Sequence, residues 1–325
     1  MKRVVIGLIF LFMPVLTDSQ NYIEYHRTIH RIDNDVLAMN YKSAIERLDS
    51  IYAGYGFIYA RHCIKALQIC VTVNDSVRAD QWLWKALVQG VPLWMIRANE
   101  LTQKSLLYST TQNTIENAAN LNAMYRSSID ENLSRRIDSL FAIDQKYTRR
   151  VNDGFILLRY TIYGAQWIMN NKRQFKIIKE IIDHYGFPGE QLIGFGFRIE
   201  DSTAIGTIQR HGPTFIDEKR AFLMLIHFFT SHQKDINDQL LQNVIGGYLP
   251  AYHFGALNDF MAKRRPKKYQ YYNVWHCDSR AENVPDINQR RHAIGLNTVE
   301  EQLRNHSIHN ERRKLRTLNS EILLE

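Results

Sequence analysis

Apolar residues recur at helical spacing along most of this chain. From Leu37 onward they fall at i, i+4, i+7, i+8, i+11 and i+15, which is one face of a helix with 3.6 residues per turn. Further helices are indicated after a break at Gly54 and Gly56 and after the N-cap candidate Asp75, and Gly90 is a stop signal. Alternating strand patterns are few. The sequence therefore predicts a mainly α fold, in which a helical-repeat-like N-terminal region is followed by a second, irregular helical domain.

The composition supports a chain with substantial hydrophobic cores. Hydrophobic residues make up 45% of the 325 positions, which excludes a disordered chain, because this much apolar surface can offset the entropy lost on folding. Three cysteines exclude a disulfide framework. Cys63 and Cys70 lie on one predicted helix, about 10 Å apart along its axis, which is too far for a disulfide. We expect both to be buried free thiols.

The first 19 residues have the pattern of a secretory signal peptide. Lys2 and Arg3 precede an apolar run over 4–16, and the residues at 17–19 follow at the spacing that signal peptidase prefers. The alternative is a membrane anchor, but Pro14 interrupts the run, which is shorter than the roughly 20 residues that cross a bilayer. We predict cleavage before Gln20 and export to the periplasm or the medium, with no membrane span in the mature chain.

The mature chain divides into three predicted parts. Residues 20–125 form the repeat-like region, 126–305 an uncharacterised helical domain and 306–325 a charged helical tail. Small Ala between large aromatics in the first part is typical of tetratricopeptide-type helix pairs, and an irregular bundle is the alternative. The polar stretch 110–122 is either a linker or the start of a long helix. Later helices are predicted over 132–150, 155–184, 217–231, 235–245 and 250–264.

Positive charge is concentrated towards the C-terminus. The chain has a formal charge of +8, with basic clusters at 263–268, 290–291 and 312–314. Such clusters can follow phosphates, and Tyr269, Tyr271 and Tyr272 beside the first cluster can stack on bases. In an exported protein, an anionic glycan or lipid surface is at least as good a counter-charge. Nucleic acid is therefore not a predicted partner.

Several elements of the second half occur in a characteristic order. They are Asp144-Gln145, the helix that runs into His184-Tyr185-Gly186-Phe187-Pro188, Leu192-Ile193-Gly194, Gln209-Arg210-His211 and Arg290-Arg291-His292-Ala293-Ile294-Gly295-Leu296. Over about 129–305 the chain resembles a bacterial family catalogued only as a domain of unknown function. Exported members of that family often carry a helical repeat-like segment before this domain. The resemblance implies a helical domain of an exported bacterial protein, and it implies no particular reaction.

The candidate catalytic residues are Asp144, His211 and Arg290. A carboxylate can orient an imidazole that acts as a general base, while an arginine holds an anion. In the alternative interpretation, Asp144 caps a helix or pairs with Arg149, and His211 lines a turn. The candidate binding residues are Gln145, Arg149, His184, Tyr271 and Arg291.

The remaining patterns do not complete a metal or cofactor motif. His26, His30 and Asp33 share one helical face at a spacing that can chelate zinc, but the Glu of the His-Glu-x-x-His motif is missing, and we predict no metal site. Gly194 and Gly196 lack the third glycine of a dinucleotide loop, so we predict a turn there and no cofactor.

These observations favour a binding or scaffolding protein of the bacterial cell envelope with a protein partner there. The hypothesis depends on the repeat-like helices, the basic clusters and the lack of a complete catalytic motif. The alternative is a hydrolase-type enzyme that uses Asp144, His211 and Arg290 or Arg291. The sequence sets no oligomeric state, and it leaves open whether the protein is an enzyme.

Overall fold

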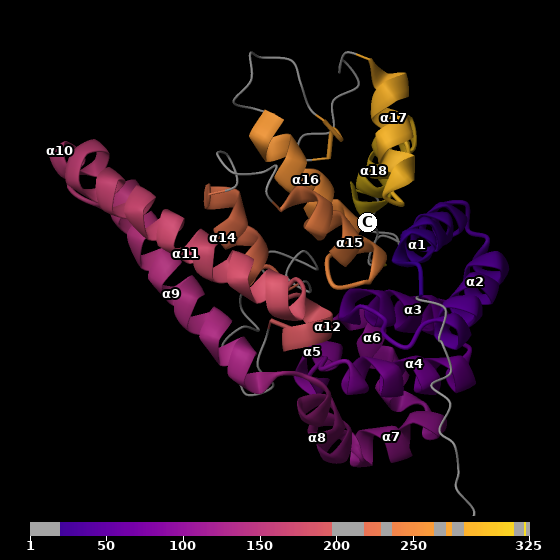
Figure 1. Cartoon of the computed structure of the whole chain (residues 1–325). Helices are drawn as coiled ribbons and strands as arrows, with labels where there is room; N and C mark the ends of the chain where they lie inside the picture. The colour runs from indigo at the N-terminus through magenta and orange to yellow at the C-terminus, as the bar shows by residue number, and fades with distance from the viewer. Residues whose placement is uncertain are drawn as a thin grey trace, which may run out of the picture.

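The mainly α prediction is confirmed by the computed structural model, which describes residues 20–196, 218–228, 236–262, 271–274, 283–314 and 322. Over these ranges the regular elements are all helices. Figure 1 shows a compact group of N-terminal helices, a long helical hairpin that runs away from it, and C-terminal helices between and above them. The helical spacing of apolar residues in the sequence therefore corresponds to helices throughout the described ranges.

The helices after Gly56 follow the predicted boundaries, whereas the helix predicted from Leu37 begins only at Tyr41, because Leu37 ends a separate helix and Met39 has φ +60° between the two. Asp75 caps α4 by accepting a hydrogen bond from the backbone N–H of Arg78 (3.0 Å), and Gly90 follows the end of that helix with φ +89°. Helix α1 packs on α2, and α3 packs on α4. The four helices are α1 (Tyr22–Leu37), α2 (Tyr41–Gly54), α3 (Ala60–Thr72) and α4 (Ser76–Val88). Their tetratricopeptide-like arrangement stays a prediction.

Short helical turns connect α4 to the second half. The elements are α5 (Leu93–Ala98), α6 (Glu100–Gln103), η1 (Lys104–Leu107), η2 (Ser109–Thr111), α7 (Gln112–Glu116) and α8 (Ala118–Ser128). The stretch 110–122 is thus helical and packed rather than an open linker, because its polar side chains have partners. Thr114 donates to Asp80 (2.6 Å), and α8 lies against α4.

The helices predicted over 132–150 and 155–184 form the long hairpin. The first helix of the hairpin is α9 (Glu131–Asp153), and the second is α11 (Gly164–Tyr185). The connection consists of α10 (Ile156–Leu158) and a π-helical turn, η3 (Arg159–Tyr163). In Figure 1 the end that carries α10 projects far from the rest of the molecule.

The C-terminal helices cover the base of this hairpin and one side of α1. They are α12 (Glu190–Ile193), α14 (Arg220–Phe228), α15 (Asn237–Ile245), α16 (Ala251–Ala262), α17 (Val284–Ala293) and α18 (Val299–Lys314). Helix α14 packs on both α9 and α11, and α18 packs on α1. Because α18 is continuous, the predicted start of a separate tail at residue 306 falls inside a helix.

Tyr125 of α8 ties the N-terminal helices to the second half. Its hydroxyl accepts a hydrogen bond from the backbone N–H of Phe195 (2.5 Å). Gly90 and Gly194 both have positive φ, and a Cβ at either position would overlap the Tyr125 side chain. Burial raises the pKa of Tyr125 above its usual value. Tyr125 therefore fills a space that only glycine leaves open on both sides.

Cys63 and Cys70 are buried free thiols on α3, as predicted. Burial raises the pKa of Cys70 to about 12 and raises that of Cys63 still further above its usual value. At neutral pH neither side chain is a thiolate, so neither has the reactivity of a catalytic or metal-binding cysteine. Cys277 lies outside the described residues.

A buried ion pair crosses the N-terminal core. The Lys65 ammonium on α3 lies 2.6 Å from an Asp33 carboxylate oxygen on α1, and the two side chains are 0% and 1% exposed. Burial removes the hydration of both charges, and their mutual attraction offsets that cost. Removal of one charge therefore lowers the stability of the fold. This pair therefore fixes how α1 sits on α3.

We expect Lys65→Met to lower the free energy of unfolding by about 3–5 kcal/mol, because the buried Asp33 carboxylate loses the ammonium group that lies 2.6 Å from it. Urea unfolding of the mature chain followed by circular dichroism measures this loss. Addition of Asp33→Leu to the variant should restore part of it. Lys179→Met, which removes a half-exposed pair with Asp183, is the control and should cost less than about 1 kcal/mol. Equal losses from the two variants would contradict the role of burial.

Candidate functional site

The structure gives Asp144 an imidazole partner on a different helix. Asp144 is fully buried on α9, and one of its carboxylate oxygens lies 2.9 Å from Nδ1 of His227 on α14. About a fifth of the His227 side chain is exposed. The second imidazole nitrogen, Nε2, has no hydrogen-bond partner within the described residues.

Neighbouring side chains fix this pair in place. Gln145 donates to the second Asp144 oxygen (3.0 Å), and the Trp167 indole lies edge-on to the His227 ring with centroids 5.6 Å apart. Trp167 in turn donates from Nε1 to the Thr148 hydroxyl (3.3 Å). The side chains around the Asp144–His227 pair thus come from three helices, α9, α11 and α14.

Helix α14 is anchored to α9 at its first turn as well. Arg220 forms ion pairs with Asp138 of α9 and with Glu218. Burial by itself would lower the pKa of the Arg220 guanidinium, but the carboxylates of Glu218 and Asp138 raise that pKa above its usual value. Arg220 and His227 are seven residues apart, so both project from nearly the same face of α14 towards α9.

This geometry suits general-base chemistry. A carboxylate at Nδ1 holds the neutral imidazole with its proton on Nδ1, which leaves the Nε2 lone pair available to accept a proton. Within the described ranges no group of three or more His, Cys, Asp or Glu side chains is arranged to hold a metal ion. Chemically, the site is an oriented base with an aromatic wall.

Sequence reasoning assigned Asp144 the role of orienting an imidazole and named His211 as its partner. His211 lies outside the described residues, as do Gln209 and Arg210, so that pairing stays a prediction. His227 was missed, because it sits in the most apolar predicted helix and periodicity suggested only core packing there. The signal that could have found it is the single imidazole on that helix, two turns after Arg220.

Arg290 and Arg291, the predicted anion-binding pair, lie on α17 and have different surroundings. The Arg290 guanidinium covers the Tyr271 ring at 4.4 Å, and its Nε donates to the Tyr271 carbonyl (2.9 Å). Arg291 is only 1% exposed and donates to the carbonyls of Tyr272 (2.9 Å) and Asn297 (2.5 Å). In Figure 1, α17 lies beyond α14 and α16 as seen from α9. Neither arginine is described in contact with Asp144.

A buried carboxylate completes the surroundings of Arg291. Asp259 of α16 accepts hydrogen bonds from the backbone N–H groups of Tyr272 (2.6 Å), Asn273 (3.1 Å) and Val274. Arg291 binds the carbonyls of Tyr272 and Asn273 from the other side. Asp259 and Arg291 thus clamp the 271–274 segment, and the donors of Arg291 act within the fold rather than on an exposed anion.

The other predicted binding residues are separate from one another. Arg149 is exposed on the distal part of α9, and Gln145 serves Asp144. His184 is exposed at the end of α11, where its Nδ1 lies 2.7 Å from the Glu180 carbonyl oxygen. From the predicted set, the structure therefore brings together Asp144 with Gln145 at one place and Arg290 with Tyr271 at another.

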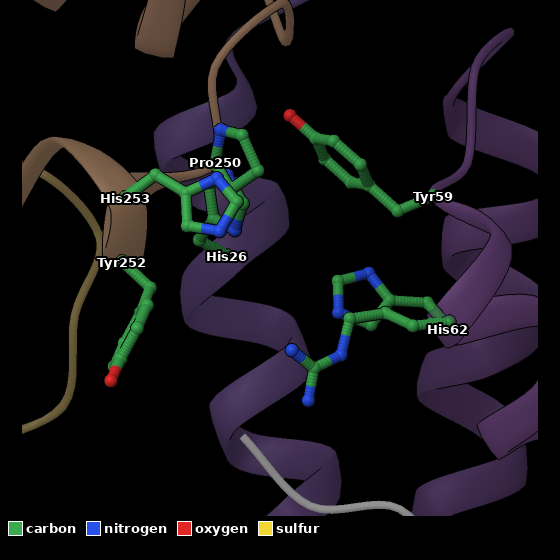
Figure 2. A pocket seen from close by; sticks show the side chains of 7 residues that line it. His26, Tyr59, His62, Pro250, Tyr252 and His253 are labelled. Atoms are coloured by element: carbon green, nitrogen blue, oxygen red, sulfur yellow. The ribbon is translucent and has the colours of Figure 1, made fainter. Parts of the chain in front are cut away.

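A small pocket lies at the seam between the two halves of the chain. Its empty space is about 320 Å³ with the mouth included, and Figure 2 shows Tyr59 and His62 facing Tyr252 and His253 across it, with His26 from α1. Its lining residues are His26, Tyr59, Arg61, His62, Pro250, Tyr252 and His253.

Several pocket side chains hold the seam itself. The Tyr59 hydroxyl donates to the Gly247 carbonyl (2.7 Å), and His62 Nδ1 lies 2.7 Å from the Tyr25 hydroxyl. The His253 ring stacks on Phe222 with centroids 4.3 Å apart. The Tyr59 contact joins the start of α3 to the turn after α15, whereas the other two join α3 to α1 and α16 to α14, so these side chains pack within the fold.

The end of the hairpin exposes large apolar side chains. Phe155, Ile156, Leu157 and Ile162, which we call the apolar tip, are 63%, 65%, 72% and 51% exposed. Seven of the 17 exposed large apolar side chains in the described parts of the chain lie between Ile143 and Met169. Monomeric soluble proteins rarely gather such side chains in one place, and a gathered patch marks an interaction surface.

Comparisons of the chain with protein-family models, with curated proteins and with solved structures found no match. The resemblance to a bacterial domain of unknown function therefore stays a prediction. None of the described helices is both long enough and apolar enough to span a bilayer. Two local features, the Asp144–His227 pair and the apolar tip, are accordingly the candidate functional sites.

We expect the neutral His227 ring to carry its proton on Nδ1, because the Asp144 carboxylate accepts a hydrogen bond there. Nitrogen-15 shifts of the His227 ring, measured by NMR, distinguish the two neutral forms. Asp144→Asn should move the proton towards Nε2, whereas Asp138→Asn, which leaves the His227 contact intact, should not. A wild-type ring that is protonated on Nε2 would contradict the orientation proposed for this pair.

Proposed function

We propose that this protein is a binding or scaffolding protein of the bacterial cell envelope that engages its partner through the apolar tip. The observation that carries the proposal is the exposure of Phe155, Ile156 and Leu157 at the far end of a projecting hairpin. Water contact with three adjacent large apolar side chains is unfavourable, and a partner that covers them removes that penalty.

The packing at the base of the hairpin supports this role. Helix α14 packs on both α9 and α11, and two polar contacts, Arg220 with Asp138 and His227 with Asp144, hold it there. A surface carried by a packed element loses less conformational entropy on binding than one carried by a loop. The hairpin therefore acts as a supported arm that presents its tip.

The proposal includes export and family membership. The basic and apolar pattern of residues 1–19 supports a cleaved signal peptide and a mature protein in the periplasm or the medium. The order of Asp144-Gln145, Tyr185-Gly186-Phe187-Pro188 and Ile294-Gly295-Leu296 supports membership of the uncharacterised bacterial family named above.

The test is retention of the mature chain on washed cell envelopes. We expect wild-type protein to sediment with the envelopes and a Phe155→Ser, Ile156→Ser, Leu157→Ser variant to lose about tenfold or more in apparent affinity, as loss of burial of large apolar side chains implies. All three positions are exposed, so the variant should keep the thermal unfolding midpoint of the wild type.

Leu107→Ser is the matched control, because Leu107 is 83% exposed at the end of η1, which packs on α3, α4 and α6 and not on the hairpin. That variant should sediment like the wild type. Equal retention of wild type and tip variant would overturn the proposal that the tip is the binding surface.

The second candidate function is a hydrolase-type enzyme in which His227, held by Asp144, replaces His211 as the predicted general base. A carboxylate-bound imidazole that is about a fifth exposed, and whose Nε2 has no partner among the described residues, favours it. In such a reaction the imidazole takes a proton from water or a hydroxyl as that group attacks an acyl carbon, and later returns it to the leaving group.

A panel of activated esters tests this candidate with purified mature protein. If His227 is the base, His227→Gln should lower hydrolysis about 100-fold or more, which is within the usual contribution of a general base. His184→Gln, at an exposed imidazole on the end of α11, should leave the rate unchanged. A wild-type rate no greater than that of His227→Gln on every ester would rule out this use of the site.

A further inference from the structure

We infer that the surface covered by the apolar tip is an acidic phospholipid bilayer, into whose interfacial region Phe155, Ile156 and Leu157 enter. This inference rests on the proposed function and names its partner. It is carried by the way the apolar side chains are distributed around the tip and by the charge beside them.

The distribution of side chains suits a fluid surface better than a groove on a protein. A helix that docks in a protein groove presents anchors at i, i+3, i+4 and i+7, all on one face. Phe155, Ile156 and Leu157 are instead consecutive, and successive residues of a helical turn project about 100° apart. Ile162 adds a fourth exposed apolar side chain on the return of the chain. The exposed apolar side chains of the tip therefore do not share one helical face, and acyl chains can contact them from several sides.

The charge beside the tip is complementary to an acidic surface. Between Gln145 and Ile168 the chain has four Lys or Arg and one Asp. Arg149 and Arg150 are exposed, and neither forms an ion pair with any described residue. At 1.5 Å per helical residue they lie within about 10 Å of Phe155 along α9, which is close to the screening length at physiological salt.

Arg159 and Tyr147 fit the same orientation. Arg159 is half-buried beside the tip, where it donates to the Gly154 carbonyl (2.6 Å) and closes the turn. The Arg150 guanidinium lies 5.9 Å from the centroid of the Tyr147 ring. An aromatic ring with a polar end and a long basic side chain are both favoured at the level of lipid headgroups.

The depth of entry is limited by the same residues. The apolar tip is too short to cross a bilayer, and a peripheral element of this kind reaches about 5–10 Å into the boundary of headgroups and acyl chains. Arg149, Arg150 and Asp153 then remain among the headgroups. The hairpin would stand on the surface, and the body of the protein would be held away from it at the other end of α9 and α11 (Figure 1).

The experiment is flotation of the mature chain with vesicles made of equal parts phosphatidylglycerol and phosphatidylcholine. Wild-type protein should float with these vesicles, should not float with phosphatidylcholine alone, and should be released as salt is raised. The Phe155→Ser, Ile156→Ser, Leu157→Ser variant should bind about tenfold more weakly or worse, whereas Leu107→Ser should bind like wild type.

Two double variants on the hairpin test whether binding depends on the position of the positive charge. Arg149→Gln with Arg150→Gln should weaken binding about fivefold for each charge removed. Lys172→Gln with Arg173→Gln removes the same charge from exposed positions that lie about 15 Å from Ile162 along α11, beyond the screening length, and should have little effect. Equal losses from the two double variants would overturn the tip-down orientation.

The failures of this inference and of the proposed function are distinguishable. Tip-dependent retention on envelopes without flotation on acidic vesicles would overturn the lipid surface and leave the binding role in place. If retention on envelopes does not depend on the tip, both fail. Equal flotation on both vesicle compositions would overturn the acidic requirement. A third outcome is that the wild type does not float but self-associates in sedimentation velocity, and that the tip variant does not self-associate. That result would assign the tip to a contact with a second copy of the chain instead.

Discussion

The attachment of α14 to the hairpin is the constraint on which the rest of the second half depends. Arg220 and His227, two turns apart on one face of α14, bind Asp138 and Asp144 of α9. Since α14 also packs on α11, both hairpin helices are held at their base. The same contacts orient the His227 imidazole and support the arm that carries the apolar tip. The candidate base and the candidate binding surface are therefore consequences of one packing arrangement.

Burial separates polar residues that stabilise the fold from those that are available for function. Lys65 with Asp33, and Arg291 with Asp259 around the 271–274 segment, have their charges satisfied inside the protein. His227 is different, because one nitrogen is satisfied by Asp144 while part of the ring remains exposed. The apolar tip presents the converse case, in which large apolar side chains are outside. A partly exposed, carboxylate-bound imidazole and a cluster of exposed large apolar side chains both depart from the usual placement of polar residues outside and apolar residues inside. Both features therefore point to function.

Neighbouring residues with the same chemistry can have opposite roles. Arg290 and Arg291 are indistinguishable as a basic pair in the sequence, yet a helix turns them about 100° apart. Arg290 covers the Tyr271 ring at the surface, whereas Arg291 is buried among backbone carbonyls. The prediction that either could hold an anion was reasonable from composition. The direction in which each side chain points depends on which face of α17 meets the segment 271–274.

The sequence by itself determined much of the local structure: the helical class, the cap at Asp75, the stop at Gly90, and the burial of Cys63 and Cys70. These features depend on propensity and spacing within a few residues, which the sequence states directly. It also indicated that Asp144 would orient an imidazole. Only the tertiary structure decided that His227, 83 residues away, is the described partner, and that the connection after α9 lies outside the core. Both depend on how helices pack, and helical periodicity does not specify which apolar faces meet.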